Sequence, residues 1–212
     1  RSPSRGLGDV YKRQALEGTD AGVGVVDHAI VEAVLARHNY LGADQREMAI
    51  RLTRGGERVI AVAALPGTGK TTALEATVEA WKQAGYQVIG CATARTATGE
   101  LKDAGVRPSF SIASLLHQAE GWRSEGKRLP DETVIVVDEA NVTNTFDFSD
   151  LLDLVQECNG KLVTIGDPRQ IGAIGPGGLY AHWTRVGETV RLTTFRRQRR
   201  EADQRVIQLV HE

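Results

Sequence analysis

Ala63-Ala64-Leu65-Pro66-Gly67-Thr68-Gly69-Lys70-Thr71-Thr72 is the stretch that decides the fold of this chain of 212 residues. It follows an apolar run, residues 59–63, and precedes a helical pattern, which is the setting of a phosphate-binding loop. Glycines let backbone N–H groups turn toward phosphate oxygens, and the dipole of the following helix favours the same anion. Within this pattern the lysine reaches the terminal phosphates and the next hydroxyl can ligate Mg²⁺. We therefore predict a nucleotide site formed by Pro66, Gly67, Thr68, Gly69, Lys70, Thr71 and Thr72, with Thr71 as a metal ligand.

One position departs from the usual pattern of such a loop. Ala64 stands where the pattern G-x-x-x-x-G-K-[ST] has its first glycine. The entry to the loop must therefore be built with a Cβ present. A plain glycine turn is the alternative interpretation of the stretch, and the strand before it and the helix after it favour the phosphate-binding loop.

Composition restricts the function less than the motif does. The net charge is -1, so binding to nucleic acid would need a local basic face. Cys91 and Cys158 have no ligand-like spacing and are expected to be core residues of a reduced chain. The five histidines form no metal-binding group, so any metal is expected to arrive with the nucleotide. With no apolar stretch long enough for a bilayer and no signal peptide, we expect a cytoplasmic protein without a membrane partner.

The two ends of the chain suggest a fragment. Residues 1–14 (RSPSRGLGDVYKRQ) start without Met, lack apolar periodicity and resemble translated sequencing adapter, so we expect a non-native leader. A flexible basic arm is the alternative. At the other end, residues 203–212 stop inside a helical pattern.

Between the ends, strands and helices alternate. Residues 15–56 are predicted to form a small N-terminal helical segment, in which Asp27 caps a first helix and residues 43–54 form a second. Residues 57–212 are predicted to form an α/β domain, because short apolar strands between helices indicate a buried parallel sheet. The predicted strands span residues 58–63, 87–91, 134–137 and 162–165, and the predicted helices span residues 70–84, 96–104, 112–119 and 149–158. Residues 179–186 are amphipathic. Residues 120–132, polar and without periodicity, are predicted to form a surface excursion.

Two adjacent acids end the strand predicted at residues 134–137. Carboxylates at the carboxyl end of a parallel strand lie where such sheets bind ligands. Asp138 can hold Mg²⁺, directly or through water, and Glu139 can take a proton from an attacking water. The alternative is a pair of solvated acids that cap the next helix.

Two later segments again place polar residues behind apolar runs. Gln170 could hydrogen-bond the γ-phosphate or its attacking water, although Asp167 and Gln170 could also be turn formers. In the arginine cluster at residues 196–200 a guanidinium could stabilise charge on the transferring phosphoryl group. For Arg199 and Arg200 we favour the alternative, a solvated helix start or a contact with a phosphate backbone.

In this order the segments resemble the first motor domain of RecD-like superfamily 1 DNA helicases, and most closely the helicase portion of MobF-type conjugative relaxases. The resemblance covers about residues 41–198. It implies a RecA-like P-loop NTPase fold, with a parallel sheet flanked by helices. Motif I corresponds to residues 64–71, motif II to residues 138–141, motif III to residues 166–170, and motif IV to the arginines before Gln198.

The resemblance also implies roles for single residues. Residues 41–45 look like the adenine-recognition motif, so Gln45 is expected to pair with the base, and Gly42 replaces the usual serine or threonine cap. Arg197 matches the phosphate-sensing arginine best. Two segments, residues 90–95 and 111–117, stand where the family contacts single-stranded DNA. The DNA contacts this implies are Thr93, which replaces the usual proline, Arg95 and Ser114, and each could equally be structural.

The function that the resemblance implies is an ATP-hydrolysing motor domain acting on single-stranded DNA, with ATP and Mg²⁺ bound. Its catalytic residues would be Lys70, Glu139, Gln170 and Arg197. The family completes this site with a second RecA-like domain, so we expect the chain alone to bind nucleotide weakly and hydrolyse it slowly. The intact protein could be either a conjugative relaxase or a stand-alone RecD-like helicase, and the sequence does not distinguish them.

Two other classes of function compete with the motor. A degenerate ATPase module, retained as a DNA-binding or scaffold domain, is suggested by Ala64 and Thr93. Because Lys70, Asp138 and Glu139 are all present, hydrolysis is favoured over this alternative. A small-molecule or toxin-type P-loop kinase would leave residues 166–170 unexplained.

Overall fold

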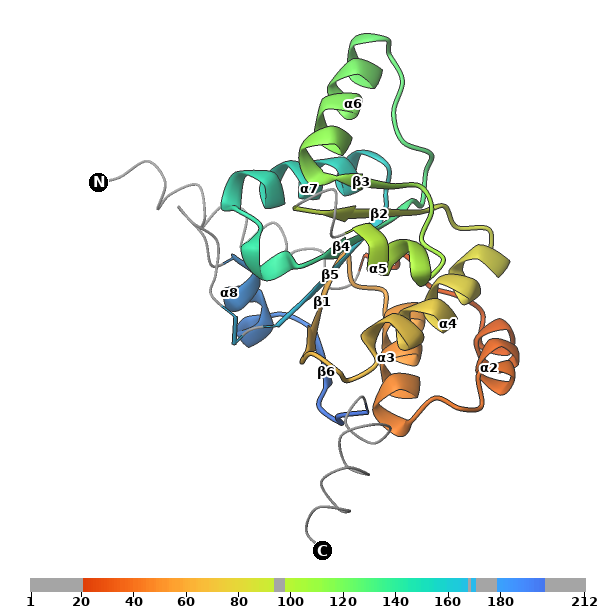
Figure 1. Ribbon diagram of the computed structural model, residues 1–212. Coiled ribbons are helices and arrows are strands. Elements are labelled where there is room, and N and C mark those ends of the chain that lie inside the picture. The colour runs from red at the N-terminus through yellow and green to blue at the C-terminus, as the bar shows by residue number, and fades with distance from the viewer. Residues whose placement is uncertain (1–20, 94–97, 168, 171–178, 197–212) are drawn as a thin grey trace, which may run out of the picture.

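The computed structural model describes residues 21–93, 98–167, 169–170 and 179–196. This part of the chain is built around a sheet of six strands in the order β3-β2-β4-β5-β1-β6 (Figure 1). All neighbouring strands are parallel, so their carboxyl ends meet at one edge. The strands are β1 (Val59–Ala64), β2 (Val88–Ala92), β3 (Ser109–Ser111), β4 (Val134–Asp138), β5 (Lys161–Gly166) and β6 (Thr189–Leu192).

Helices cover both faces of this sheet (Figure 1). One face packs against α2 (His28–Arg37), α3 (Ala43–Arg54), α4 (Lys70–Gln83) and α5 (Thr98–Asp103). The other face packs against α6 (Ile112–Ser124), α7 (Thr145–Glu157) and α8 (Leu179–Val186), and the short 3-10 helix η2 (Ala140–Val142) follows β4. None of the described helices has the length and apolar character that crossing a membrane requires.

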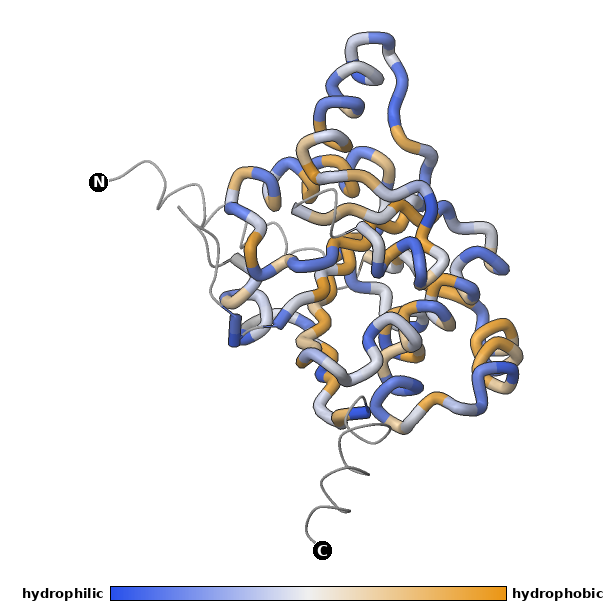
Figure 2. Tube along the Cα trace, in the orientation of Figure 1, coloured by the Kyte–Doolittle hydropathy of each residue, from blue (hydrophilic) through white to orange (hydrophobic). Residues whose placement is uncertain are grey.

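The alternation of side chains along each strand divides the core into two clusters. In β4, Val134 and Val136 belong to the cluster under α2–α5, whereas Ile135 and Val137 belong to the cluster under α6–α8. Every residue of β4 is buried, which explains why this strand is apolar without a polar face. Figure 2 shows the hydrophobic residues gathered along the central strands. The predicted α/β fold with a parallel sheet flanked by helices is confirmed.

The N-terminal helices share their core with the sheet. Leu35 of α2 and Met48 of α3 are fully buried in the same cluster as Ile60 of β1. Asp27 caps α2 as predicted, since its carboxylate accepts a hydrogen bond from the backbone N–H of Ala29 at 2.8 Å. Residues 21–56 are therefore packed as one body with the strands.

Two helices are longer than predicted. The helix α7 begins before residue 149 because the Asn144 side chain caps it, accepting hydrogen bonds from the backbone N–H groups of Phe146 and Asp147. The helix α6 includes residues 120–124, which were predicted to be surface excursion. Trp122 on this last turn packs against the second core cluster, and its neighbour Arg123 pairs with a carboxylate of α7. The edge strands β3 and β6 were not predicted.

A buried charge lies at the amino end of the sheet. Lys161, the first residue of β5, has no exposed surface, and its Nζ donates to the carbonyl oxygen of Gly55 at 2.5 Å. Burial lowers the pKa of Lys161 to about 8, although the charge of Glu57, whose Oε2 is 3.8 Å away, acts in the opposite direction. The lysine thus ties the loop before β1 to the neighbouring strand β5.

The lowered pKa of Lys161 predicts stability that rises with pH. The unfolded lysine keeps its proton up to about pH 10.5, whereas the folded one loses it near 8, so between these values the unfolded chain binds more protons. Relative to Lys161→Met, the free energy of unfolding of the wild type should gain about 2 kcal/mol between about pH 7 and about pH 9.5, at about 1.36 kcal/mol per unit. Urea unfolding of both proteins at the two pH values measures this, and an unchanged difference would contradict it.

Candidate functional site

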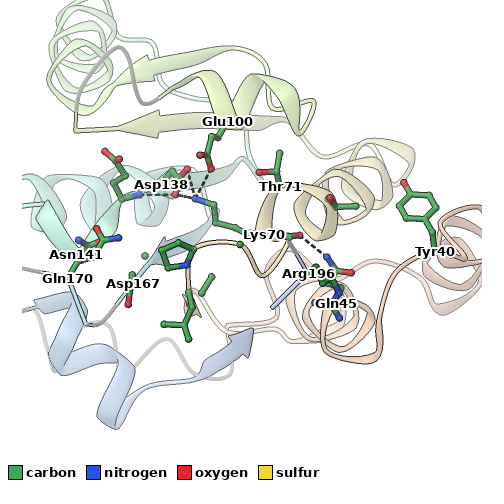
Figure 3. A pocket seen from close by; sticks show the side chains of 18 residues that line it. Tyr40, Gln45, Lys70, Thr71, Glu100, Asp138, Asn141, Asp167, Gln170 and Arg196 are labelled. Atoms are coloured by element: carbon green, nitrogen blue, oxygen red, sulfur yellow. Dashed lines mark hydrogen bonds and ion pairs between the residues drawn. The ribbon is translucent and has the colours of Figure 1, made fainter. Parts of the chain in front are cut away.

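A pocket of about 730 Å³ opens at the carboxyl edge of the sheet (Figure 3). Its wall combines the loop between β1 and α4, the ends of β4 and β5, the start of α3 and the segment after β6. The structure thus brings together most of the residues that the sequence predicted for a nucleotide site. Those in the wall are Gln45, Pro66, Gly67, Gly69, Lys70, Thr71, Thr72, Asp138, Glu139 and Gln170, while Thr68 is buried behind it.

The phosphate-binding loop, residues 64–71, has the backbone that its glycines predict. Gly67 and Gly69 have φ values of 82° and 76°, in the left-handed region that glycine adopts without strain. A Cβ added to Gly69 would also lie 2.4 Å from Nε2 of Gln45. Ala64, by contrast, is the last residue of β1 and pairs with Leu192 of β6, so its Cβ stands in regular strand geometry. The missing first glycine is therefore accommodated by the strand.

Donors from two distant segments hold the outside of this loop. The backbone N–H of Arg196 donates to the carbonyl oxygen of Gly67 at 2.8 Å, and its guanidinium Nη1 donates to that of Thr68 at 2.9 Å. Nε2 of Gln45 donates to the carbonyl oxygen of Gly69 at 2.8 Å. Three successive carbonyl groups are thereby satisfied, which fixes the shape of the loop.

Arg196 is itself fixed by a carboxylate of α3. Its guanidinium is hydrogen-bonded to Asp44, which also accepts from the backbone N–H of Thr194. Desolvation works to raise the pKa of Asp44, but the hydrogen bonds and charge of Arg196 outweigh it, and the pKa falls below its ordinary value. The sequence analysis assigned the phosphate-sensing role to Arg197, which lies outside the described residues. Arg196 is the first arginine of the cluster at residues 196–200, and no separate role was predicted for it from the sequence.

Gln45 is almost fully buried beside the loop, with 3% of its surface exposed. Its Oε1 accepts from the backbone N–H of Gly42 at 3.0 Å, while its Nε2 is bonded to the loop. Nε2 also donates to the carbonyl oxygen of Thr68 at 3.5 Å, so the amide has one lone pair of Oε1 left for a ligand. Recognition of the base by Gln45 stays a prediction.

Lys70 is paired with two acids (Figure 3). Its Nζ donates to both carboxylate oxygens of Asp138, at 2.7 and 2.9 Å, and lies 3.1 Å from Oε2 of Glu100. Burial works to lower the pKa of Lys70, but the charges and hydrogen bonds of Asp138 and Glu100 outweigh it and raise the pKa. Glu100, on α5, was not predicted, because no motif marks it and only the crossing from β2 to α5 brings it over the pocket.

Glu139, the exposed residue that follows the buried strand β4, has a strained backbone. Its φ is 53°, in the left-handed region, where a non-glycine residue costs about 1–3 kcal/mol and is found preferentially at functional sites. The backbone N–H of Glu139 donates to Oδ1 of Asp138 at 2.9 Å. This turn leaves Asp138 nearly buried and turns the exposed Glu139 into the pocket wall.

Asn141 adds a buried donor to the same wall. It is 8% exposed, and its Nδ2 has no partner in the described part of the chain. Motif II, residues 138–141, contains this residue, but no role was predicted for it. A Cβ at Gly166 would lie 2.8 Å from Oδ1 of Asn141, so the end of β5 must be a glycine to pack here. Asn141 is the second site residue, after Glu100, that the sequence analysis missed.

Asp167 and Gln170 were predicted either to form a turn or, for Gln170, to face the phosphate, and the structure places the two residues differently. Asp167 forms a turn, in which its Oδ1 accepts from the backbone N–H of Arg169 at 2.9 Å and its carbonyl oxygen accepts from that of Gln170 at 3.1 Å. The turn leaves the side chain of Gln170 exposed at the pocket. A contact of Gln170 with phosphate or water stays a prediction.

Of the residues predicted to contact DNA, the two that the structure describes, Thr93 and Ser114, do not line this pocket. Thr93 follows β2 and is half-buried, and Ser114 is exposed in the first turn of α6, where its backbone N–H donates to Oγ of Ser111 at 3.2 Å. Arg95 lies outside the described residues. Because β2 and β3 are neighbours, Thr93 and the start of α6 follow adjacent strand ends at the carboxyl edge.

A phosphate-binding loop at the carboxyl edge of a parallel sheet, with an acid pair ending a nearby strand, defines the class of P-loop NTPases. The chain belongs to the AAA domain family, whose model matches residues 40–212.

Individual relatives are conjugation proteins and a helicase. The probable conjugal transfer protein TraA of Sinorhizobium fredii is 35% identical over 174 residues, which are 81% of this chain and 15% of that protein. The multifunctional conjugation protein TraI of Escherichia coli is 28% identical, over 78% of this chain and 9% of that protein. The ATP-dependent RecD2 DNA helicase of Deinococcus radiodurans is 23% identical, over 80% of this chain and 24% of that protein. The chain thus spans less than a quarter of the length of each of these relatives.

A solved structure confirms the fold. The Pif1 helicase from Candida albicans superposes with a TM-score of 0.55 at 18% identity, covering 81% of this chain and 43% of that one. The predicted resemblance to RecD-like helicases and to the helicase portion of conjugative relaxases is confirmed by these relatives. The chain is a helicase-like ATPase motor domain related to the conjugal transfer proteins TraA and TraI.

The contacts of Arg196 predict a cost for removing its side chain. Arg196→Ala leaves the carbonyl of Thr68 and the carboxylate of Asp44 without this donor, so it should destabilise the fold by about 1–3 kcal/mol. The control is Arg123→Ala, which removes an exposed pair with Glu157 at 2.7 Å and should cost at most about 1 kcal/mol. Urea unfolding compares the two variants, and an equal loss in both would contradict a special role for Arg196.

Proposed function

We propose that this chain binds ATP with Mg²⁺ and hydrolyses the nucleotide, and that it drives the intact protein along single-stranded DNA. The observation that carries the proposal is the convergence of Lys70, Asp138 and Glu139 on one pocket at the end of the phosphate-binding loop. Its relatives support it, since they are named for conjugation and for ATP-dependent DNA helicase activity. Such a motor would work in the cytoplasm, where its nucleotide is available.

The residues at the loop fit a phosphate-bound Mg²⁺. Asp138 is 3% exposed, and its buried charge is compensated by Lys70. If Lys70 turns to the phosphates, the carboxylate needs another cation, which a metal ion provides. Thr71, in the first turn of α4, and Asp138 would hold this ion. When bound, Mg²⁺ supplies charge neutralisation at the phosphate oxygens.

Hydrolysis is then divided among side chains of the pocket. Lys70 exchanges its two acidic partners for the terminal phosphate oxygens, and Gln170 orients the attacking water. Glu139, exposed at the wall, accepts the proton of that water at its carboxylate. Arg197, assigned by the resemblance alone, stabilises charge on the transferring group.

The DNA would run over the carboxyl ends of β2 and β3. Thr93 and Ser114 follow these neighbouring strands, which supports the roles proposed for them and for Arg95. A second RecA-like domain of the intact protein would complete both the ATP site and the DNA path. In this proposal the chain alone binds nucleotide weakly and turns it over slowly.

Replacing the proposed base tests the hydrolysis. Glu139→Gln in the intact protein should lower ATP turnover by about 10²–10⁴-fold and leave nucleotide binding in place. The matched control is Glu132→Gln, because Glu132 precedes the same strand at its other end and also has a left-handed backbone, with a φ of 62°. Its turnover should equal that of the wild type. Equal rates for wild type and Glu139→Gln would refute the role of Glu139.

The same assay tests the action on DNA. Single-stranded DNA should stimulate turnover by the intact wild-type protein, and absence of stimulation would contradict a DNA motor. Salt-sensitive DNA binding without any hydrolysis would instead favour the alternative, a degenerate ATPase module, which Ala64 and Thr93 motivate.

A further inference from the structure

An exposed aromatic ring lies at the end of the pocket away from the acids (Figure 3). Tyr40 is 61% exposed, yet it lines the pocket together with Gln45 and the phosphate-binding loop. Of the large hydrophobic residues that are exposed in the described ranges, it is the one that belongs to this wall. Neither the resemblance nor any motif gave it a role.

The ring is held in place through its hydroxyl group. The Tyr40 hydroxyl lies 2.8 Å from Nδ1 of His38, and Nε2 of the same imidazole lies 2.6 Å from Oε2 of Glu79. A carboxylate only accepts, so Nε2 carries hydrogen, and in the neutral imidazole Nδ1 then accepts from the hydroxyl. His38 is 8% exposed, so the imidazole that anchors the hydroxyl is buried although the ring of Tyr40 is not. We call His38 and Glu79 the anchor of Tyr40.

The anchor ends on the helix that begins at the phosphate-binding loop. Glu79 belongs to α4 and also accepts hydrogen bonds from Arg37 at 2.7 Å and from Gln83 at 2.9 Å. Desolvation works to raise the pKa of Glu79, but the hydrogen bonds from His38 and Arg37 outweigh it. The pKa therefore falls below its ordinary value, which favours the ionised carboxylate. From residue 70 to residue 79 this helix rises about 13 Å, which sets the anchor well back from Lys70.

We propose that Tyr40 stacks on the nucleotide base and gives the site its preference for purine nucleoside triphosphates, with His38 and Glu79 as the positioning residues of its ring. This inference rests on the proposed function, because it assumes that phosphates occupy the loop at Lys70. The base would then extend toward Gln45 and Tyr40 in the same pocket. Oε1 of Gln45 keeps one lone pair for a donor on the edge of a base. Tyr40 offers a π-face, which favours the larger purine ring.

Stacking on an aromatic side chain predicts a defined loss when the ring is removed. Binding of MgATP, MgUTP and inorganic tripolyphosphate is measured by calorimetry for wild type, Tyr40→Ala and Tyr40→Phe. The wild type should prefer ATP to UTP. Tyr40→Ala should weaken ATP binding about tenfold to hundredfold, leave tripolyphosphate binding unchanged and narrow the preference for ATP. Tyr40→Phe, which keeps the ring and loses its anchor, should retain most of the preference.

A second tyrosine beside α4 supplies the control. The hydroxyl of Tyr86 donates to the carbonyl oxygen of Val25 at 2.9 Å, outside the pocket, so Tyr86→Ala should leave the ratio of ATP to UTP affinity unchanged. His38→Ala removes the same anchor as Tyr40→Phe, so it should lower that ratio only partly, to the level of Tyr40→Phe, without changing tripolyphosphate binding, as a positioning role requires. Thermal unfolding of each variant confirms that it is folded.

The outcomes separate this inference from the proposed function. A folded wild type that binds none of the three ligands refutes the proposed function and the stacking role with it. A wild type that binds tripolyphosphate and ATP equally well refutes the stacking role alone, since the base then contributes nothing. An unchanged ATP preference in Tyr40→Ala also overturns it.

Discussion

Three consecutive carbonyl groups, those of Gly67, Thr68 and Gly69, determine much of the surrounding architecture. A loop that offers its N–H groups to phosphate must satisfy its carbonyl groups elsewhere, because orphaned backbone groups are costly. Here the donors are Gln45 on α3 and Arg196 behind β6, from opposite ends of the described chain. The N-terminal helices and the edge strand β6 therefore serve the shape of the loop and are more than peripheral additions to the sheet.

The charges around Lys70 show a second dependence. Its partners come from different elements, Asp138 from the end of β4 and Glu100 from α5. In the proposed nucleotide-bound state both must give up the ammonium group before it can bind phosphate. Nucleotide affinity is consequently the net result of an exchange, in which new charge-assisted bonds replace existing ones. Because Asp138 is buried and Glu100 is exposed, losing the ammonium costs Asp138 more, and a metal ion offsets that loss.

The features that could be predicted from the sequence are those that depend on burial and on strand direction. The strands β1, β2, β4 and β5 are apolar because they are covered on both faces, and their parallel arrangement places Lys70 beside Asp138. The edge strand β3 reads Ser-Phe-Ser and carries no such signal. Glu100 and Tyr40 escaped prediction for another reason. Their positions depend on how α5 and the turn after α2 pack, and the spacing of residues in the sequence does not predict that packing.

The two ends of the pocket differ in how completely their polar groups are satisfied. At the end proposed to hold the base, Gln45 and Tyr40 are already held by hydrogen bonds. At the phosphate end, Glu139 has a strained backbone and Nδ2 of Asn141 lacks a hydrogen-bond partner. Among the buried side-chain atoms of the described residues that have no partner, Nδ2 of Asn141 is the one in the pocket wall. A ligand oxygen there would satisfy that donor, whereas the base would meet groups that need no rearrangement. In the proposed function, binding energy from the base could therefore be used to reorganise the groups assigned to hydrolysis.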